Sequence, residues 1–495
     1  MKKFTRKILS VVLVVMIILG TFSIVSVSAS TYTYGDYGYE ELSDGTISIT
    51  VYNGTSEKIV IPSEINGKTV TEIGDEVFKY CTSLKSITLP NNLKKLGSEA
   101  FRSCTGLTSI TIPKTLESCG LYPFVNSGIK TAVIESGMTK IPYYLFRYCD
   151  NLESVSIPST VTEIDAYAFD GCTSLAKINL PSNLKSIGTA AFRNCTGFSS
   201  IVIPKTLETV EENAFLNTAF TSAVIENGMT TIPDSLFENC ASLKEVTIPS
   251  TVTVIGSYAF RNCSSLKSIT LPSNLKEISI QAFYGCTGII SITIPNTLKN
   301  CGLHPFENTG ITSVVFEDGI KIIPEGLFED CSTLKSVTLP NSVISISNSA
   351  FKGCTNLSGI FLPESLDRIG ADAFADCTSL KSIFVPETVT YIGSNALGYN
   401  DNSIISDFVI YSKSSAVQTY ANKNNIEYVA KSASDVIVGD VDENGVVNIM
   451  DATLIQKYCV AMESFTAIQM VAADTNNDGN ITVSDSTTIQ KSLVS

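Results

Sequence analysis

The chain has 495 residues, with 34 lysine and arginine residues against 48 aspartate and glutamate residues, so its formal net charge at pH 7 is −14. Because negative charge repels phosphate groups, this balance argues against nucleic acids and anionic membrane surfaces as partners. Tryptophan is absent and histidine occurs once, at His304, which weakens the case for a tryptophan-based sugar platform or for histidine-based catalysis.

The first 29 residues have the pattern of a secretory signal peptide. Four basic residues between positions 2 and 7 precede an apolar run over 8–20, and Val27-Ser28-Ala29 supplies a small-residue cleavage signal. Its removal leaves 30 basic residues (34 − 4) against 48 acidic ones, a net charge of −18. No later run is long enough to cross a bilayer, so we expect an exported protein that is not membrane-spanning after cleavage. An uncleaved membrane anchor is the alternative interpretation of this run.

Residues 30–75 lie before the regular part of the chain and begin with a tyrosine-rich segment. Four tyrosines stand within eight residues there, and we interpret them as part of a cap or a mobile tail rather than as a binding site. They are Tyr32, Tyr34, Tyr37 and Tyr39.

A short sequence motif recurs through most of the chain; "AFRNC" at 191–195 and 259–263 is one example of it. The spacings between its aromatic residues are 23, 23, 22 and 23, and this cycle then recurs, so that four units form a block of 91 residues. Such internal repetition indicates a stacked architecture. The repeat positions are Phe78, Phe101, Phe124, Phe146, Phe169, Phe192, Phe215, Phe237, Phe260, Phe283, Phe306, Phe328, Phe351, Phe374 and, in last place, Leu397.

Each repeat has the same internal plan, as in "CTSLKSITLPNNLKKLGSEAF" over 81–101. Alternation over 84–89 predicts a strand, and Pro90 ends it because proline cannot donate to a sheet. Leu93, Leu96 and Phe101 then return to the interior. Since one coil cannot bury these side chains alone but stacked coils can, we expect a β-rich solenoid of about 15 coils of 22–23 residues over 76–412. At ~4.8 Å per coil it would be roughly 70 Å long.

The repeating unit, written aFxxCxxLxxIxLPxxLxxIgxxaF, resembles the BspA-like bacterial leucine-rich repeat. The resemblance extends over about residues 38–430. It implies that residues 30–75 form the N-terminal cap of the solenoid. It also implies that 413–430, which include "SSAVQTYANKNNIEYVA", form a C-terminal cap of one helix and one strand.

Eleven of the 14 cysteines stand three residues after a repeat phenylalanine. Stacking would align them in one column, a geometry that neither converges on a metal ion nor favours disulfide dihedrals. The third coil of each block lacks this cysteine and is one residue shorter, so we interpret the column as buried structural thiols; disulfides and metal or redox chemistry are the alternatives. The column is Cys81, Cys104, Cys149, Cys172, Cys195, Cys240, Cys263, Cys286, Cys331, Cys354 and Cys377.

Two further cysteines, Cys119 and Cys301, occupy a position where ordinary coils place a core isoleucine. We therefore expect both to be buried. His304 stands where the equivalent earlier coil has Tyr122, without a recognisable catalytic partner. Since no nucleophile elbow, phosphate loop or zinc motif occurs either, we expect the protein not to be an enzyme.

The predicted strand face carries small hydroxyl side chains at the second and fourth positions after the strand leucine. A solvated sheet face is one interpretation, and an extended surface for a protein or a polysaccharide is the other. Four exceptions are the candidate contact residues: Phe361 and Phe384 replace threonine, and Lys177 and Glu245 replace serine. The hydroxyl residues are Ser86, Ser109, Ser154, Ser200, Ser268, Ser291, Ser336 and Ser382, with Thr88, Thr111, Thr247, Thr270, Thr293 and Thr338.

After a short polar linker at 431–438, two segments that start 34 residues apart match calcium-binding loops. Calcium takes oxygen ligands from loop positions 1, 3, 5, 7, 9 and 12, with glycine at position 6. Gly445 and Gly479 stand at that position, and a helical apolar pattern follows each loop. The predicted ligands are Asp440, Asp442, Asn444, the Val446 carbonyl, Asn448 and Asp451 in the first loop, and Asp474, Asn476, Asp478, the Asn480 carbonyl, Thr482 and Asp485 in the second.

This duplicated loop–helix pattern over 439–495, with its paired "IQK" words and aspartate at both twelfth positions, resembles a type I dockerin. The resemblance implies a small all-α domain with two Ca²⁺ ions that binds a cohesin module on a scaffold protein. The two halves differ at loop positions 10 and 11, so they need not bind equally. The residues that the resemblance assigns to cohesin are Ile449, Met450, Gln456 and Lys457, and Val483, Ser484, Gln490 and Lys491.

Together these resemblances imply a secreted, non-catalytic protein held at a cell surface or in a cellulosome-like, polysaccharide-degrading complex. Its dockerin would bind a cohesin, and its solenoid would present a surface for protein recognition. Two alternatives remain for the solenoid: a carbohydrate-binding or adhesin component, and an accessory polysaccharide-degrading enzyme.

Overall fold

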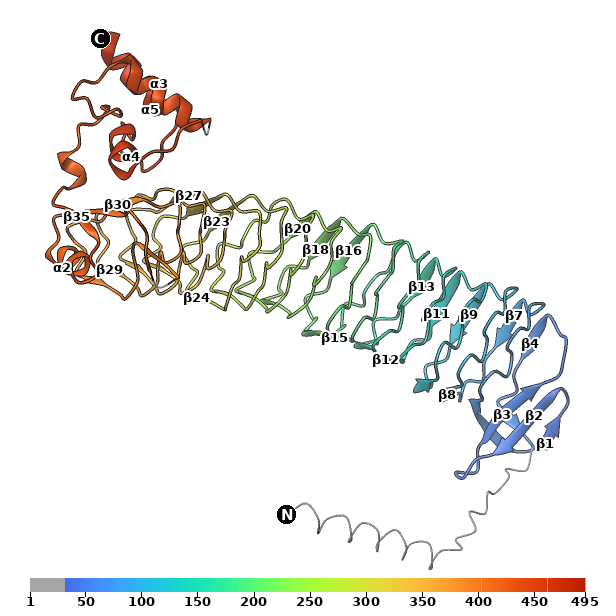
Figure 1. The fold of residues 1–495 in the computed structure, drawn as a ribbon. Coiled ribbons are helices and arrows are strands. Elements are labelled where there is room, and N and C mark those ends of the chain that lie inside the picture. Colours follow the sequence, from blue (N-terminus) through green and yellow to red (C-terminus); the bar gives the residue numbers. More distant parts are fainter. Residues whose placement is uncertain (1–31, 402, 461, 495) are drawn as a thin grey trace, which may run out of the picture.

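The computed structural model describes residues 32–401, 403–460 and 462–494; the predicted signal peptide, residues 1–29, lies outside them. The described chain forms a long, gently curved rod with a small antiparallel sheet at one end and a helical unit at the other (Figure 1). Within the described ranges, no helix combines the length and the apolar character needed to cross a membrane. The predicted β-rich leucine-rich repeat solenoid with a small helical domain is confirmed.

The first end of the rod is closed by strands. Tyr37 and Tyr52 pack partly buried against the core, and the ring of Tyr52 lies 5.0 Å from that of Phe78, the first repeat phenylalanine. The tyrosine-rich segment therefore covers the first coil. The strands are β1 (Tyr32–Tyr34), β2 (Tyr37–Glu41) and β3 (Ile47–Tyr52), which are antiparallel, and β5 (Glu64–Ile65) and β6 (Lys68–Ile73), of which β6 runs parallel to β3.

One row of short parallel strands follows the predicted strand face along the rod. Each strand is shorter than predicted: β7 covers Ser86–Thr88 of the expected 84–89. The row consists of β4 (Lys58–Val60), β7, β9 (Ser109–Ile112), β11 (Thr131–Ile134), β13 (Ser154–Ser156), β16 (Ser200–Ile203), β18 (Ser222–Ile225), β20 (Glu245–Thr247), β23 (Ser291–Ile294), β25 (Ser313–Phe316), β27 (Ser336–Thr338), β30 (Ser382–Phe384), β34 (Val409–Tyr411) and β35 (Glu427–Val429).

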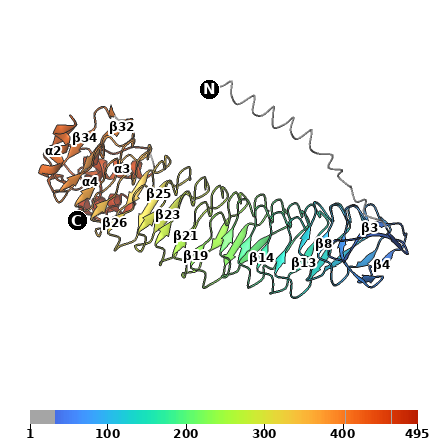
Figure 2. The ribbon, with the colours of Figure 1, turned by 90° about the horizontal axis from the view of Figure 1, so that it is seen from below.

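A second row, which the sequence did not predict, lies on another side of the rod, and Figure 2 shows its strands β19 and β21 side by side. Two-residue strands are too short to show a period of two. The row consists of β8 (Lys95–Leu96), β10 (Ser118–Cys119), β12 (Lys140–Ile141), β14 (Glu163–Ile164), β15 (Ser186–Ile187), β17 (Thr209–Val210), β19 (Thr231–Ile232), β21 (Val254–Ile255), β22 (Glu277–Ile278), β24 (Asn300–Cys301), β26 (Ile322–Ile323), β28 (Ser345–Ile346), β29 (Arg368–Ile369) and β31 (Tyr391–Ile392); β32 (Tyr399–Asn400) and β33 (Ser403–Ile404) form a hairpin near the end.

The 91-residue block is visible in the hydrogen bonding of the first row. Its sheets comprise β9-β11-β13, β16-β18-β20, β23-β25-β27 and β30-β34-β35. The segments between these sheets, at 177–180, 268–271 and 359–362, form no strand of the first row, and they stand 91 residues apart (268 − 177 and 359 − 268). The duplication of the sequence thus produces a matching interruption of the sheet.

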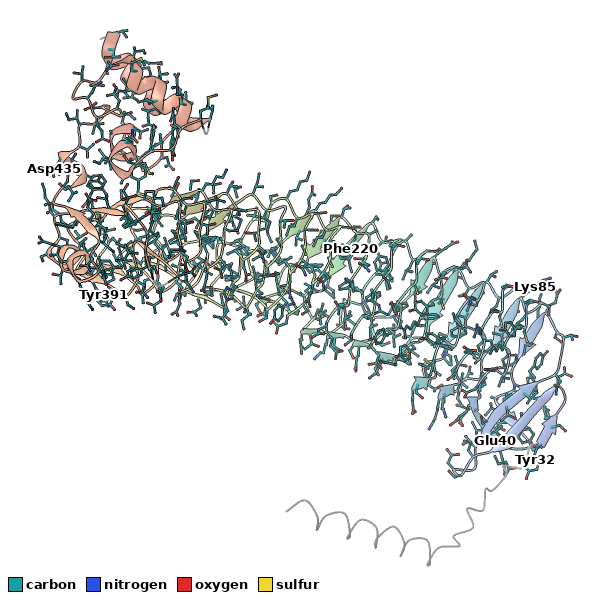
Figure 3. The ribbon with its side chains drawn as sticks, in the orientation of Figure 1. Tyr32, Glu40, Lys85, Phe220, Tyr391 and Asp435 are labelled. Atoms are coloured by element: carbon teal, nitrogen blue, oxygen red, sulfur yellow. The ribbon has the colours of Figure 1, made fainter. Side chains whose placement is uncertain are left out.

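The repeat phenylalanines form a continuous stack inside the rod. Their side chains are at most 1% exposed, and neighbouring rings lie nearly parallel, as for Phe260 and Phe283 with centroids 5.2 Å apart. Between Phe215 and Phe237 the stack is bridged by Phe220, which meets both rings edge-on. Phe220 lies near the middle of the rod (Figure 3). Adjacent coils therefore contact each other through this stack in a common hydrophobic core.

The cysteine column lies beside the phenylalanine stack, as predicted. All column members except the partly buried Cys81 are buried, and all 14 cysteines of the chain are free thiols. Each of the ten buried thiols donates a hydrogen bond to the carbonyl oxygen of the repeat phenylalanine one coil earlier, at 2.9–3.5 Å. The thiols therefore fill the bend and add a second hydrogen bond to a carbonyl that already accepts one from the backbone of its own turn.

In the third coil of each block, a residue with a hydroxyl group stands in place of the column cysteine. Thr218 and Thr309 stand three residues after their phenylalanines and donate to the carbonyls of Phe215 and Phe306, at 2.9 and 2.8 Å. Cys119 and Cys301 pack against the core as expected but are only partly buried, so the expectation of full burial was wrong. Their thiols donate to the carbonyl oxygens of Tyr143 and Glu325 in the following coil.

Native alkylation is expected to spare the ten buried column thiols. Burial is the main cause that raises the pKa of Cys104 and of Cys377 to about 12, and the thiolate is the reactive form. At pH 8 this lowers the thiolate fraction about a thousandfold relative to an ordinary thiol. Mass spectrometry after iodoacetamide treatment should find Cys81 and Cys459 modified first. Cys119 and Cys301 are partly buried too, but burial raises the pKa of both thiols to about 12. Urea should release all 14 thiols, and rapid native labelling of the column would contradict its burial.

The chain ends in a helical unit with its own hydrophobic core, centred on Val441, Ile455, Met470 and Ile489. The predicted helices after both calcium-binding loops are present, and an additional helix, α4, ends directly before the second loop. The helices are α2 (Ser415–Lys423) beside the last coil, a short 3₁₀ helix (Ala433–Asp435) in the linker, α3 (Ile449–Cys459), α4 (Ala467–Ala473) and α5 (Val483–Val494).

Candidate calcium and partner-binding sites

The first predicted calcium loop closes around its own carboxylates. Asp440 accepts backbone hydrogen bonds from Asn444 at 3.0 Å and Gly445 at 2.9 Å, and Gly445 adopts φ +85°, which favours glycine. Asp440, Asp442 and Asp451 each direct a carboxylate oxygen into one place, with these atoms within 4.8 Å of one another. The loop contains no cationic side chain, so a bound cation would relieve the repulsion among these three groups.

The second loop repeats the backbone hydrogen bonding of the first, with different residues at positions 3 and 5. Within the described chain, the convergence of three carboxylates within 4.8 Å is found in the first loop and not in the second. Asp474 accepts from the backbone of Asp478 at 3.0 Å and of Gly479 at 2.9 Å. Burial is the main cause that raises the pKa of Asp474, and the negative charges of Asp478 and Asp485 act in the same direction. An oxygen-rich loop of this kind suits a hard cation such as Ca²⁺.

The twelfth loop residue also lies in the first turn of the following helix. Asp451 is fully buried, and it accepts hydrogen bonds from the backbone N–H groups of Val441 and Asn448, each at 2.8 Å. Asn448 in turn accepts from the backbone of Met450 and completes a capping box at the start of α3. Asp485 accepts from the backbone of Thr482 in the same way before α5. A ligand at position 12 is thereby coupled to the formation of each helix.

The residues that the dockerin resemblance assigns to cohesin lie mostly on the surface. Ile449, Met450 and Val483 are 54%, 60% and 57% exposed, which is unusual for apolar side chains. Ser484, Gln456, Lys457 and Lys491 are also exposed, and Gln490 is partly exposed. The structure therefore leaves apolar side chains at the start of both α3 and α5 available to a partner.

His304 is less isolated than the sequence indicated. Its Nδ1 atom lies 3.6 Å from a carboxylate oxygen of Glu307 and 3.7 Å from one of Asp330. Glu329 also reaches this group, but its carboxylate forms an ion pair with Lys352 at 3.1 Å. The cluster is a partly exposed ion-pair group on the turns of two adjacent coils.

The strand face is mostly exposed, as expected for the hydroxyl residues, but four valines also belong to it. Val133, Val202, Val224 and Val315 occupy the fourth position and are exposed, so this face also offers apolar side chains. Lys177 and Glu245 are exposed as well. Phe361 and Phe384 differ, because both pack against the hydrophobic core of the helical unit.

Comparison with known protein families matches 71–199, 191–309 and 302–428 to the BspA type leucine rich repeat region, and 438–494 to the type I dockerin domain. Among curated proteins, no match was found.

Crystal structures of bacterial leucine-rich repeat proteins are similar to much of the chain. One from Bacteroides ovatus is 23% identical, covers 80% of this chain and 99% of its own, and has a TM-score of 0.49. A leucine rich cell surface protein from Faecalibacterium prausnitzii is 25% identical and covers 77% and 98%, with a TM-score of 0.36. One from Eubacterium ventriosum is 22% identical and covers 78% and 98%, with a TM-score of 0.39.

The repeat matches together extend from residue 71 to residue 428, well over half of the 495 residues. The dockerin match includes both calcium loops and the three helices α3, α4 and α5. The predicted resemblances are therefore confirmed. The chain belongs to the BspA-type leucine-rich repeat family and carries a type I dockerin domain after the repeats.

Proposed function

We propose that this is an exported, non-catalytic interaction protein, anchored through its calcium-dependent dockerin to a cohesin module on the scaffold of a cellulosome-like, polysaccharide-degrading complex. In this proposal the solenoid at 76–412, capped by 30–75 and 413–430, presents a surface for protein recognition. The linker at 431–438 joins it to the dockerin at 439–495. Neither matched domain type is catalytic.

The observation that carries the anchoring role is the pair of matched loops. Each places the residues that we propose as oxygen ligands around a left-handed glycine, and continues into a helix whose first turn has exposed apolar side chains. Type I dockerins bind calcium. The proposal of two calcium sites rests on the repetition of this geometry at 440–451 and 474–485.

The strand face supports protein recognition more than sugar binding. Its exposed side chains are mostly serine, threonine and valine, with Lys177 and Glu245 among them. In the described part of the chain they offer hydrogen bonds and small apolar contacts rather than a broad aromatic platform. Retention on insoluble polysaccharide in the presence of EDTA, when the dockerin cannot act, would favour the carbohydrate-binding alternative. Polysaccharide cleavage removed by a defined carboxylate substitution would favour the enzyme alternative.

Charged substitution at the start of α3 or α5 is expected to weaken cohesin binding. Met450→Asp and Val483→Asp place a carboxylate in an apolar contact, and loss of such a contact costs about tenfold or more in affinity. The measurement is binding of the full chain to a panel of immobilised cohesin modules in calcium. Because the halves differ, we expect one substitution to act more strongly.

Ile437→Asp is the matched control, since Ile437 is equally exposed but lies in the linker. Calcium binding measured by calorimetry should be unchanged in all three variants. If both substitutions leave every cohesin interaction intact, the assigned binding face is wrong. If no cohesin binds the unmodified chain in calcium, the anchoring role itself is wrong.

A further inference from the structure

The last coils of the solenoid depart from the repeat at three positions on one face. Gly359 occupies a position that is most often serine, and Phe361 and Phe384 occupy positions that are most often threonine. Ser382 keeps the usual residue but is 8% exposed, whereas the equivalent Ser336 is exposed. These four residues, together with Thr338, form what we call the dockerin seat.

Helix α4 lies on the seat, above β30 (Figure 1). Phe361 and Phe384 pack against the dockerin core, which includes the buried Met470 of α4. A Cβ atom at Gly359 would lie 2.0 Å from the sulfur of Met470, so the usual serine would displace that side chain. The departures from the repeat therefore fit the shape of α4.

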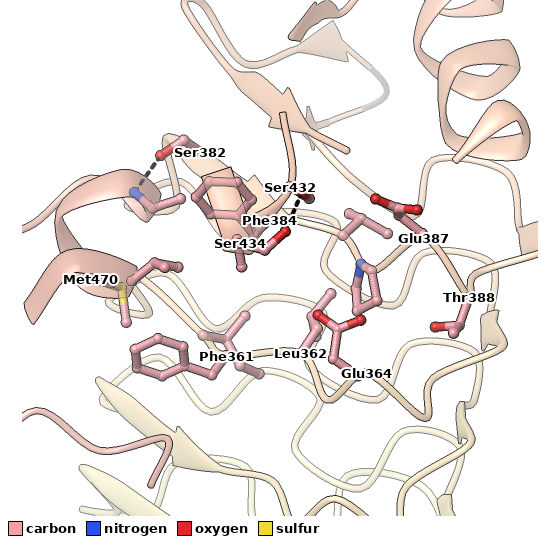
Figure 4. A pocket seen from close by; sticks show the side chains of 16 residues that line it. Phe361, Leu362, Glu364, Ser382, Phe384, Glu387, Thr388, Ser432, Ser434 and Met470 are labelled. Atoms are coloured by element: carbon pink, nitrogen blue, oxygen red, sulfur yellow. Dashed lines mark hydrogen bonds between the residues drawn. The ribbon is translucent and has the colours of Figure 1, made fainter. Parts of the chain in front are cut away.

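Two hydrogen bonds fix the position of the dockerin on the seat. The Ser382 hydroxyl accepts from the backbone N–H of Ala467 at 2.9 Å, which satisfies a free donor in the first turn of α4 (Figure 4). The Thr338 hydroxyl donates to the side-chain oxygen of Asn480 at 2.6 Å. In the linker, Lys413 and Asp435 form an ion pair at 2.7 Å that holds the connection near the last coil.

The contact leaves the partner-binding residues free. Ile449, Met450 and Val483 retain their exposure while the dockerin lies on the seat. A pocket of about 550 Å³ remains between the two units, lined by Phe361, Phe384 and Met470 and open toward Glu364 and Glu387 (Figure 4). Docking on the solenoid and binding of a cohesin thus use different sides of the dockerin.

We infer that the dockerin seat is a dedicated intramolecular docking surface for α4 and the second calcium loop of this chain's own dockerin, and that it holds the dockerin at one orientation on the rod. The solenoid would then lie at a defined angle to a cohesin bound to this dockerin. This goes beyond anchoring, because a dockerin on a free linker would leave the direction of the rod undetermined.

Docking is coupled to calcium through Asn480, a part of the inference that rests on the proposed second calcium site. Asn480 occupies loop position 7, where the backbone carbonyl is the ligand, so its side chain can bond to Thr338 at the same time. Calcium binding would order the loop and thereby hold the Asn480 side chain where it can accept the hydrogen bond from Thr338. By linkage, docking must in turn raise the calcium affinity of the second loop.

Hydrogen exchange of the full chain in calcium tests the seat. The triple variant Gly359→Ser, Phe361→Thr and Phe384→Thr restores the common residues of ordinary coils, so we expect the solenoid to stay folded. Exchange of the backbone amides of α4, Ala467–Ala473, should become about tenfold faster or more. Small-angle scattering should show a broader distribution of distances, because the dockerin is no longer held.

Val202→Thr is the matched control, since it makes the same kind of change at an exposed position of the strand face far from the dockerin. It should leave the exchange of α4 and the scattering profile unchanged. If the triple variant also leaves both unchanged, the seat does not hold the dockerin and the inference is overturned.

Thr338→Val tests the coupling separately, because it removes the bond to Asn480 and leaves the second loop, including the bond from Asn480 to the Asp478 carbonyl, unchanged. Calorimetric calcium titration should show the same number of sites, with lower affinity at one of them. In the triple variant the same substitution should have no further effect on affinity. Equal effects in both backgrounds would overturn the coupling. Absence of calcium binding in the unmodified second loop would overturn the proposed site and leave the exchange result as the test of the seat.

Discussion

Addition of EDTA to the full chain is expected to abolish cohesin binding while the solenoid remains folded. Without a cation, the carboxylates of Asp440, Asp442 and Asp451 repel one another within 4.8 Å, and Asp451 also caps α3. At a calcium concentration about 100 times Kd, each site stabilises the domain by ~2.7 kcal/mol, which is lost on chelation. Cohesin affinity should therefore fall about a hundredfold or more.

The measurement combines cohesin binding with circular dichroism during an EDTA titration. The helical signal should decrease and the β-sheet signal should persist, because the solenoid and the dockerin have separate hydrophobic cores. Calcium in excess over EDTA should restore both binding and helicity. Magnesium at the same concentration is the control for an effect that any divalent cation would produce. Cohesin affinity that is unchanged in EDTA would contradict the calcium-dependent mechanism.

Truncation of one stacked phenylalanine should cause the largest loss of stability. Phe260 is fully buried and lies 5.2 Å from the ring of Phe283 at an interplanar angle of 1°. Phe260→Ala leaves a cavity and removes an aromatic contact, so its expected cost is about 3–5 kcal/mol of the free energy of unfolding. Urea unfolding followed by the β-sheet signal measures this loss.

Phe260→Leu is the matched substitution, because Leu397 occupies the equivalent position in the last repeat. It retains most of the apolar volume, and we expect a smaller loss than for alanine. Since each coil contacts only its neighbours, the alanine variant should also unfold first around its own coil. Equal stability of the two variants would show that the stack does not carry the interaction between coils.

The repeat was predictable because every coil repeats the same local requirement. Alternation over 84–89 and the spacing of Leu93, Leu96 and Phe101 place these side chains inside, and stacking buries them all. The second row of strands was missed because pairs such as Lys95–Leu96 are too short to show a period. The bonds from the cysteine thiols to phenylalanine carbonyls were also missed, because they join residues in different coils.

The shape of the two predicted calcium loops could be expected for a related reason: the residues proposed as ligands lie within twelve consecutive residues, so each arrangement is local. The ligands themselves and the number of calcium sites remain predictions. Glycine at the sixth position has a left-handed φ in both loops, as the pattern requires. The residues that contact a cohesin remain predictions taken from the resemblance, and their exposure at 449–450 and 483–484 is compatible with that role.

By itself, the sequence determined the stacked coils, the two loops and the family to which each part belongs, because these depend on neighbouring residues and on a period that can be counted. Only the tertiary structure decided what Gly359, Phe361 and Phe384 do. In the sequence they are three irregularities more than 80 residues before Met470. Contact with α4 depends on how the linker folds back over the last coils, and no local pattern specifies that path.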